Sequence, residues 1–229
     1  MGQDWAVAAR EPAPTGWDFP PADSAGPQDV VAAGADLEPG TVLAAYRAGL
    51  FPMPEGRRQV LWWSPVDRGV FEPAGFTPSR TLRRARQRYE IRVDTAFDEV
   101  LRGCADPSRP GAWIDAGIIA AYTRLHELGW VHSVEACDDE GLAGGLYGVA
   151  IGGLFAGESM FHRRTDASKA AVAGTIELLS DRHARARVFD VQWLTPHLES
   201  LGAVEIPRRE YLRRLGPALA VPLPAAFER

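Results

Sequence analysis

The stretch VHSVEACDDEGLAGGLYGVAIGGLFAGESMFH, residues 131–162, decides the fold. The helical spacing of apolar residues before it changes here to a period of two, and two short turns, DDEG and GG, divide the stretch into three runs. A period of two is typical of β-strands, and turns as short as these join antiparallel neighbours. The stretch therefore predicts an antiparallel meander of three strands.

Glycine is frequent within this meander. Five glycines fall on its adjacent strands, namely Gly144, Gly145, Gly148, Gly153 and Gly157. Glycine inside a strand usually marks a bulge or the close approach of another group to the backbone. We therefore expect something to pack flat against this sheet, although bulges alone would also explain the pattern.

The segments that follow the meander complete a mixed sheet. We predict a helix over residues 167–184, a strand over 187–192 (RVFDVQ), a short helix at HLESLGA, and a closing segment VEIPRREYLRRL. Three antiparallel strands, then a helix, then another strand is the order of the acyltransferase-like core called GNAT. The predicted class is therefore α+β, with a GNAT-like mixed sheet in the C-terminal part of the chain.

The region before the meander reads as a loop-rich start followed by short elements. We predict a helix over 39–49, a strand over 59–65, a helix opened by Thr77 as its N-cap, a strand at YEIRVD, a helix over 95–103, and a helix capped by Asp115. We place a boundary near Ser64. Residues 1–63 would form a small N-terminal domain and residues 64–229 a larger one.

Positive charge is concentrated in one segment of an acidic chain. The formal net charge is −5, but RTLRRARQRYEIR, residues 80–92, holds six arginines against one glutamate. Such a patch can meet phosphate groups, and it can equally be the solvated face of a helix. The chain has one lysine, Lys169, which is either retained for a purpose or a tolerated surface residue.

Two polar residues stand inside an apolar strand. Asp190 and Gln192 are two apart in RVFDVQ, so a strand would point both to the same face. A carboxylate held among apolar residues must be paired or hydrogen-bonded. Asp190 is therefore either a structural residue that ties down a loop, or part of a site in which it orients Gln192.

Several classes of site are disfavoured by their missing motifs. GESMF lacks the closing glycine of a nucleophile elbow, no phosphate-binding glycine loop occurs, and the five histidines lack metal-ligand spacing. The helix start RRTDASKAA lacks the glycines of a coenzyme A turn. We therefore expect no metal and no cofactor. With no apolar run of 18 residues, no signal peptide and two free cysteines, a cytoplasmic protein without a membrane span is expected.

The sequence resembles the bacterial leucyl/phenylalanyl-tRNA–protein transferase family. The matching stretches run in order from about Ala44 to Leu212, and they are AYRAGLFP, LWWSP, SRTLRR, AYTRLHELGWVHSVE, GGLYGVAIGGLFAGESMF, ASK, FDVQ and SLGAVEIPRREYL. The resemblance implies transfer of Leu or Phe, and sometimes Met, from aminoacyl-tRNA to the N-terminal Arg or Lys of a protein. It also implies that the product is marked for N-degron-dependent degradation, and that a monomer acts without metal or coenzyme A.

The resemblance also assigns roles to residues. It makes Asp190 and Gln192 the catalytic pair, with Gln192 accepting a hydrogen bond from the attacking amine and Asp190 orienting and polarising Gln192. Substrate contacts are implied for an apolar pocket lined by Leu146, Phe155 and Met160 with Glu158 and Ser159 at its rim, for Trp113 beside the terminal adenosine, and for Tyr46 and Tyr122 near it. Contacts with tRNA are implied for Arg80, Arg83, Arg84 and Lys169.

Other functions stay open at the level of sequence. The same fold would suit a cell-wall peptide transferase that uses aminoacyl-tRNA, or a coenzyme A-dependent N-acetyltransferase. A module that only binds RNA would explain the arginine-rich helix but leaves the DVQ and GESMF stretches without a role.

Overall fold

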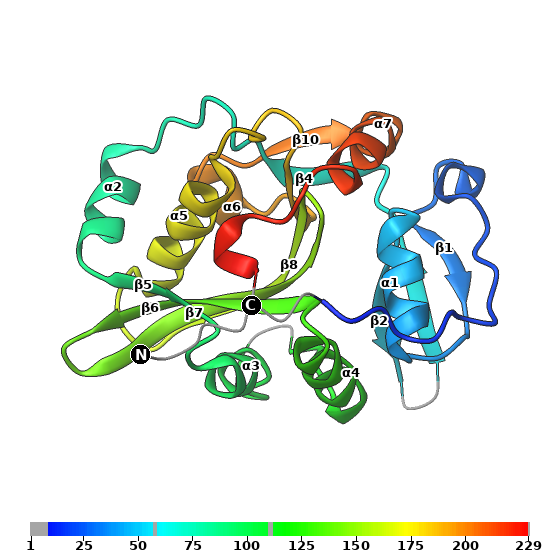
Figure 1. Cartoon of the computed structure of the whole chain (residues 1–229), viewed down its shortest axis with the longest axis horizontal. Coiled ribbons are helices and arrows are strands. Elements are labelled where there is room, and N and C mark those ends of the chain that lie inside the picture. The colour runs from blue at the N-terminus through cyan, green and yellow to red at the C-terminus, as the bar shows by residue number, and fades with distance from the viewer. Residues whose placement is uncertain (1–8, 57–58, 110–111, 229) are drawn as a thin grey trace.

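The computed structural model describes residues 9–56, 59–109 and 112–228, which form two sheets covered by helices (Figure 1). The smaller sheet has the strands β1 (Val30–Ala33), β2 (Phe51–Glu55) and β3 (Gln59–Trp63). The larger one has β4 (Asp67–Phe71), β5 (Glu90–Val93), β6 (Val131–Asp138), β7 (Gly141–Ile151), β8 (Leu154–His162), β9 (Val188–Gln192) and β10 (Val204–Pro207). The helices are α1 (Pro39–Arg47), α2 (Arg80–Gln87), α3 (Phe97–Cys104), α4 (Ala116–Glu127), α5 (Ala167–Leu179), α6 (Pro196–Ser200) and α7 (Arg208–Leu219), with 3-10 turns η1 (Ala22–Ala25) and η2 (Ala225–Phe227).

The larger sheet is mixed and is covered on both faces. Its strand order is β10-β4-β9-β8-β7-β6-β5, and every neighbouring pair is antiparallel except β8 with β9, which is parallel. Helices α2 and α5 lie over one face, and α3 and α4 lie over the other (Figure 1). The expected α+β class, with a mixed sheet behind a small N-terminal region, is confirmed.

The predicted meander is also confirmed, as β6, β7 and β8. The three strands pair in chain order over nearly their whole length. The chain leaves the smaller sheet at Trp63 and enters the larger one at Asp67, so the sheets are separated near the predicted boundary. The division into domains 1–63 and 64–229 stays a prediction.

Helix boundaries differ from the sequence prediction in three places. Helix α2 is capped by Ser79, whose hydroxyl accepts a hydrogen bond from the Leu82 amide, and not by Thr77. Helix α5 ends at Leu179 because Asp181 accepts bonds from the His183 amide and the Arg187 guanidinium, which turns the chain. The closing segment is a four-residue strand followed by α7, and not a strand throughout.

Strand β4 was not predicted, and it is an internal strand of the larger sheet, next to the edge strand β10. It pairs with β10 on one side and β9 on the other. Four of its five residues are buried. Within residues 9–56, 59–109 and 112–228, no helix is both long and apolar enough to cross a membrane.

The glycines of the meander do accept close packing, and the packing groups are the protein's own. A Cβ on Gly144 would lie 2.9 Å from the Ala167 Cβ at the start of α5, and a Cβ on Gly145 would lie 2.9 Å from the Val134 carbonyl oxygen. A Cβ on Gly148 would lie 2.8 Å from the Phe155 ring and closer still to the Ala156 carbonyl oxygen. These glycines therefore allow strands and helices to approach one another.

We predict that Gly148→Ala destabilises the protein by about 1–3 kcal/mol, because the added methyl group overpacks a site bounded by backbone. Gly216→Ala is the matched control: Gly216 lies in α7 with open space at its Cβ position, so alanine there should stabilise by about 0.5–1 kcal/mol. Urea unfolding monitored by circular dichroism measures both. Equal stability of Gly148→Ala and the parent chain would contradict the packing described here.

Candidate functional site

The candidate site lies where two parallel strands separate. Strands β8 and β9 pair only from Leu154 with Val188 to Ala156 with Asp190. Beyond that point β8 continues to His162 and β9 to Gln192 without pairing to each other. Ligands in sheets of this kind bind beyond the carboxyl ends of parallel strands, because the separating strands leave a crevice there.

A β-bulge places Glu158 at this separation. In the register of β7 with β8, Tyr147 pairs with Ser159 and Gly148 pairs with Gly157, so Glu158 is the extra residue without a partner on β7. A bulge changes the direction of side chains along the strand, and bulges are frequent next to active sites. The bulge therefore gives Glu158 an orientation that regular alternation would not.

The Glu158 carboxylate is held by three donors from three different elements. The Tyr46 hydroxyl on α1 donates to its Oε1 at 2.6 Å, and the Tyr122 hydroxyl on α4 donates to its Oε2 at 3.1 Å. The Gln192 side-chain amide donates from Nε2 to Oε1 at 3.2 Å. The two tyrosine hydroxyl oxygens also lie 2.7 Å apart, and because each phenol has one proton, both can donate to Glu158 only when neither donates to the other. The smaller N-terminal region, the helical layer and the sheet thus meet at one carboxyl group.

Burial changes the acidity of this cluster. Loss of hydration raises the pKa of Glu158 to about 8, and the negative charge of Asp190 acts in the same direction. Hydrogen bonds from the two tyrosines and the charge of Arg68 act against this rise. Burial also raises the pKa of Tyr46 and of Tyr122 well above 10, so both phenols stay protonated at physiological pH.

Asp190 is paired in a different way from Glu158. The Arg68 guanidinium on β4 donates from Nε to Asp190 Oδ1 at 2.8 Å and from Nη2 to Oδ2 at 2.6 Å. The Tyr211 hydroxyl on α7 donates to Oδ2 at 2.9 Å, and the Gln192 backbone amide donates to Oδ1 at 2.9 Å. The guanidinium also lies over the rings of Phe51 and Tyr211. All of these side chains are buried.

The expected link between Asp190 and Gln192 exists, but it runs through the backbone. Asp190 contacts the Gln192 amide nitrogen of the main chain, whereas the Gln192 side chain is held by Glu158. Gln192 adopts a left-handed conformation with φ of 61°, which is costly for a residue with a Cβ and is concentrated at functional sites. Asp190 therefore does not contact the Gln192 side chain, and the expected polarisation of that side chain by Asp190 has no direct hydrogen bond behind it.

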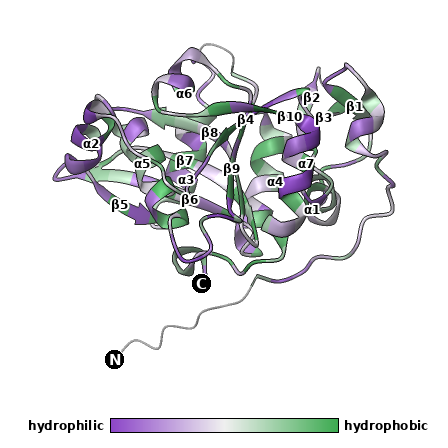
Figure 2. Cartoon of the chain, turned by 90° about the horizontal axis from the view of Figure 1, so that it is seen from above, coloured by the Kyte–Doolittle hydropathy of each residue, from purple (hydrophilic) through white to green (hydrophobic). Residues whose placement is uncertain are grey.

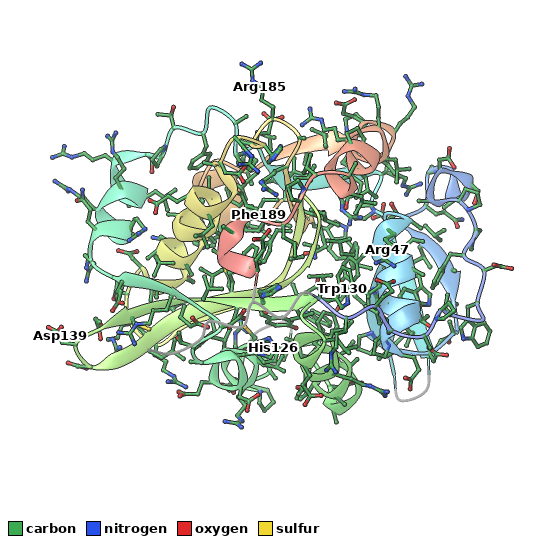
Figure 3. The ribbon with its side chains drawn as sticks, viewed as in Figure 1. Arg47, His126, Trp130, Asp139, Arg185 and Phe189 are labelled. Atoms are coloured by element: carbon green, nitrogen blue, oxygen red, sulfur yellow. The ribbon has the colours of Figure 1, made fainter. Side chains whose placement is uncertain are left out.

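An apolar pocket opens beside this polar cluster. It has a volume of about 110 Å³ and is lined by Leu146, Gly157, Glu158, Ser159, Met160, Val172, Phe189, Val191, Gln192 and Leu198. Figure 3 shows Phe189 in the interior of the molecule. Of the residues expected at the pocket, Leu146, Met160, Glu158 and Ser159 line it. Among the meander glycines, only Gly157 does.

Phe155 does not line the pocket, which corrects the expectation for that residue. Its side chain is fully buried and packs against the rings of Phe189 and Phe227. Phe155 therefore belongs to the core behind Phe189, which does line the pocket.

Tyr46 and Tyr122 were expected near a terminal adenosine, and this stays a prediction. Their side chains are at most 1% exposed, and their hydroxyls contact Glu158. Trp113 is partly buried and packs against the core that contains α3 and α4, without lining the pocket.

The basic residues lie on another part of the surface. Arg80, Arg83 and Arg84 on α2 are exposed, and none of them forms an ion pair with any described residue. Figure 2 shows α2 as a strongly hydrophilic helix at one end of the molecule. Lys169, at the start of α5, pairs with Asp166 at 2.7 Å.

Sequence reasoning missed three residues that shape the site. Arg68 and Tyr211 hold Asp190, and the need for a partner to a buried carboxylate was the only signal that pointed to them. Arg109 anchors the loop after α3 to β8 through the Met160 carbonyl oxygen at 2.6 Å and lies 3.5 Å from the Ser159 hydroxyl. No pattern in the sequence distinguished Arg109 from the other arginines.

A small apolar pocket that ends at a buried carboxyl and a fixed amide suits an apolar acyl chain held beside an amine. On a mixed sheet, such a site suits an acyl-transferring enzyme. The family model described as "Leucyl/phenylalanyl-tRNA protein transferase" matches residues 70–216 of the chain. The model of the N-terminal domain of the same family matches residues 35–66. The chain belongs to the leucyl/phenylalanyl-tRNA–protein transferase family and is an aminoacyltransferase.

Curated relatives of the same name cover most of the chain. A leucyl/phenylalanyl-tRNA–protein transferase of Anaeromyxobacter sp. (strain Fw109-5) is 48% identical over 209 residues, which are 89% of this chain and 88% of the relative. One of Aromatoleum aromaticum is 49% identical over 85% of this chain and 84% of its own length. One of Enterobacter sp. (strain 638) is 45% identical over 88% and 86%. The resemblance stated from sequence is therefore confirmed.

We predict that Arg68→Leu lowers the free energy of unfolding by about 3–5 kcal/mol, because it leaves the Asp190 carboxylate buried and unpaired. Combining it with Asp190→Asn should recover part of the loss, since the uncompensated charge is then gone. Urea unfolding of the two single variants and the double variant gives the coupling energy. A loss below about 1 kcal/mol for Arg68→Leu would contradict the pairing.

Proposed function

We propose that this chain takes Leu or Phe from aminoacyl-tRNA and joins it to the N-terminal Arg or Lys of an acceptor protein. The observation that carries the proposal is the apolar pocket whose polar end is formed by Glu158 and Gln192. An aminoacyl ester is already activated, so the enzyme has mainly to hold ester and amine together. The family name of the relatives supports the donor and the kind of acceptor.

The pocket volume suits an apolar amino-acid side chain. An engineered apolar cavity of about 150 Å³ accommodates a benzene ring. The pocket here has about 110 Å³ and is open to solvent, so the side chain of Leu or of Phe can enter it.

We propose that Gln192 binds the attacking amine. Its Nε2 is committed to Glu158, so its Oε1 is the atom that accepts a hydrogen bond from the amine. Asp190 acts by holding the Gln192 backbone in its left-handed conformation. Leu146 and Met160 would contact the aminoacyl side chain, and Ser159 would lie at the rim of the pocket. Trp113 would stack on the terminal adenosine.

We propose that α2 binds the tRNA backbone. Arg80, Arg83 and Arg84 are exposed and free of ion pairs with the described residues, so their charges are available to phosphate groups. Lys169, near the start of α5, would add to this surface, although Asp166 offsets its charge.

Further parts of the proposal concern the whole protein. The order of meander, helix and parallel strand supports a GNAT-like core in the unit 64–229, with 1–63 as a small N-terminal domain. A monomer acting in the cytoplasm, with Leu-tRNA and Phe-tRNA as donors, would mark its acceptors for N-degron-dependent degradation. The family of the chain supports these assignments.

A transfer assay tests the function directly. We predict that radiolabelled Leu from Leu-tRNA appears on a peptide with N-terminal Arg and not on a matched peptide with N-terminal Ala. Gln192→Ala should lower the rate about 100-fold while still binding aminoacyl-tRNA, because it removes a group that contacts the amine. Asp190→Ala should also lose most transfer, and its folding must be checked because Arg68 then lacks its partner. Label on neither peptide, with charged tRNA intact, would overturn the function.

Salt dependence tests the proposed tRNA surface. Removing Arg83 and Arg84 together, as alanines, should weaken tRNA binding and lower the slope of log affinity against log salt by about 1 for each lost phosphate contact. Arg102→Ala is the matched control, since Arg102 is an exposed arginine on α3, on the other face of the sheet. Filter binding at several salt concentrations measures the slope. An unchanged slope in the double variant would remove α2 from the interface.

A further inference from the structure

The site contains two buried carboxyl groups, and they differ in what their oxygens can still accept. Asp190 receives four hydrogen bonds, two from Arg68 and one each from Tyr211 and the Gln192 backbone. A carboxylate has about four lone-pair positions, so Asp190 has no vacant one. Protonating Asp190 would also leave the Arg68 guanidinium buried without its counter-ion, which is costly.

Glu158 has the opposite arrangement. Its three donors are neutral, namely two phenols and an amide, and no guanidinium or ammonium group of a described residue is paired with it. Gaining or losing a proton at Glu158 therefore breaks no ion pair. Glu158 also lines the pocket, whereas Asp190 does not. It is the carboxyl group that an incoming amine can reach.

We propose that Glu158 is the proton acceptor of the transfer reaction, taking one proton from the N-terminal ammonium group of the acceptor. This inference rests on the proposed function and assigns its proton transfer. Gln192 Oε1 would hold the amine while Glu158 takes the proton, because Gln192 is fixed to Glu158 through its Nε2.

The transfer releases one proton overall. The ammonium group gives one proton to the Glu158 carboxylate and becomes a neutral amine with a free electron pair. The amine nitrogen forms a bond to the ester carbonyl carbon, and the bond from that carbon to the ribose oxygen breaks. The second amine proton ends on the ribose hydroxyl of the released tRNA, and Glu158 returns its proton to solvent. One amide, one hydroxyl and one proton are formed.

The surroundings of Glu158 favour the neutral pair over the ion pair. A carboxylic acid beside an amine carries the same number of protons as a carboxylate beside an ammonium group, and burial disfavours the separated charges. The pKa of Glu158 is raised to about 8 by burial, which is close to that of a terminal amine, about 7.7–8.0. Donor and acceptor of the proton are therefore closely matched.

Other ionisable groups face Glu158 from five elements. Tyr46, Tyr122 and Tyr147, on α1, α4 and β7, all have pKa values raised well above 10 by burial and stay neutral. Asp190 on β9 and Arg68 on β4 carry opposite charges that compensate each other. Between about pH 6 and pH 9.5, Glu158 is thus the group of this cluster that changes charge.

The pH dependence of transfer tests the inference. The nucleophile is the neutral amine, so kcat/KM of the wild type for an Arg-peptide should rise with pH and level off above about pH 8, where both Glu158 and the amine are deprotonated. Glu158→Gln can use only amine that has already lost its proton to solvent, so its rate should fall more steeply as pH is lowered. We expect a loss relative to the wild type that is largest below pH 7 and shrinks at least tenfold by pH 9.5. Short reaction times and enzyme-free blanks correct for ester hydrolysis.

Glu135→Gln is the matched control. Glu135, on β6, is another buried carboxyl whose pKa burial raises and which hydroxyl groups hold, but it lies outside the pocket. It should keep the pH profile of the wild type. Parallel pH profiles for Glu158→Gln and an active wild type would overturn the inference alone. No transfer by the wild type at any pH would overturn the proposed function, and the inference with it.

A second readout does not depend on activity. Because the pKa of Glu158 is raised from 4.5 to about 8, the folded protein holds a proton there that the unfolded chain has lost between these values. The stability of the wild type relative to Glu158→Gln should therefore fall as pH rises from about 4.5 to about 8, and be constant above that. If the difference in unfolding free energy between the wild type and Glu158→Gln is the same at all pH values from about 4.5 to about 8, the assignment of Glu158 as the titrating group is overturned.

Discussion

One ion pair, Arg68 with Asp190, determines how the parts of the site are placed. Burying two charges costs several kcal/mol for each ion, and only a geometry that satisfies every donor and acceptor offsets this. The bidentate contact, the Tyr211 hydroxyl and the Gln192 amide supply that geometry. Because the guanidinium also reaches the Gly49 carbonyl oxygen, β4, β9, α7 and the segment after α1 are held by one charged group. Asp190 is the last residue of β9 that pairs with β8, so the ion pair lies where the two strands separate.

Two local irregularities then convert a regular sheet into a site. The bulge at Glu158 and the left-handed conformation of Gln192 lie two residues beyond the last paired residues, Ala156 and Asp190. Both irregularities are needed for the side chains of Glu158 and Gln192 to meet in a hydrogen bond. Gly69 makes room for the turn, since a Cβ there would lie 2.8 Å from the backbone of residues 193 and 194. Strain in Gln192 is thus tolerated because the surrounding contacts over-determine its position.

Local patterns in the sequence predicted the elements well, but they did not predict which side chains meet. The period of two and the short turns identified β6 to β8, and Asp115 was correctly predicted to cap α4. Strand β4 was missed because its five residues include both an aspartate and an arginine, which reads as a loop. Its Arg68 is 122 positions from Asp190, and no local rule connects residues so far apart. Residue type indicated that Tyr46 and Tyr122 belong near the site, whereas only packing shows that they are buried and serve Glu158.

The charge balance of the site explains why it contains two carboxyls with different partners. Arg68 neutralises Asp190, so that pair adds little net charge to the pocket. Glu158 in its protonated form is neutral as well, and the surrounding phenols stay protonated. An ammonium group that enters this environment brings a charge that the ionised form of Glu158 offsets, and this form can also accept the ammonium proton. If Glu158 had been paired with an arginine as Asp190 is, the ammonium group would have met a cation and no acceptor. The neutral donors around Glu158 are therefore what allows an amine to enter and become a nucleophile.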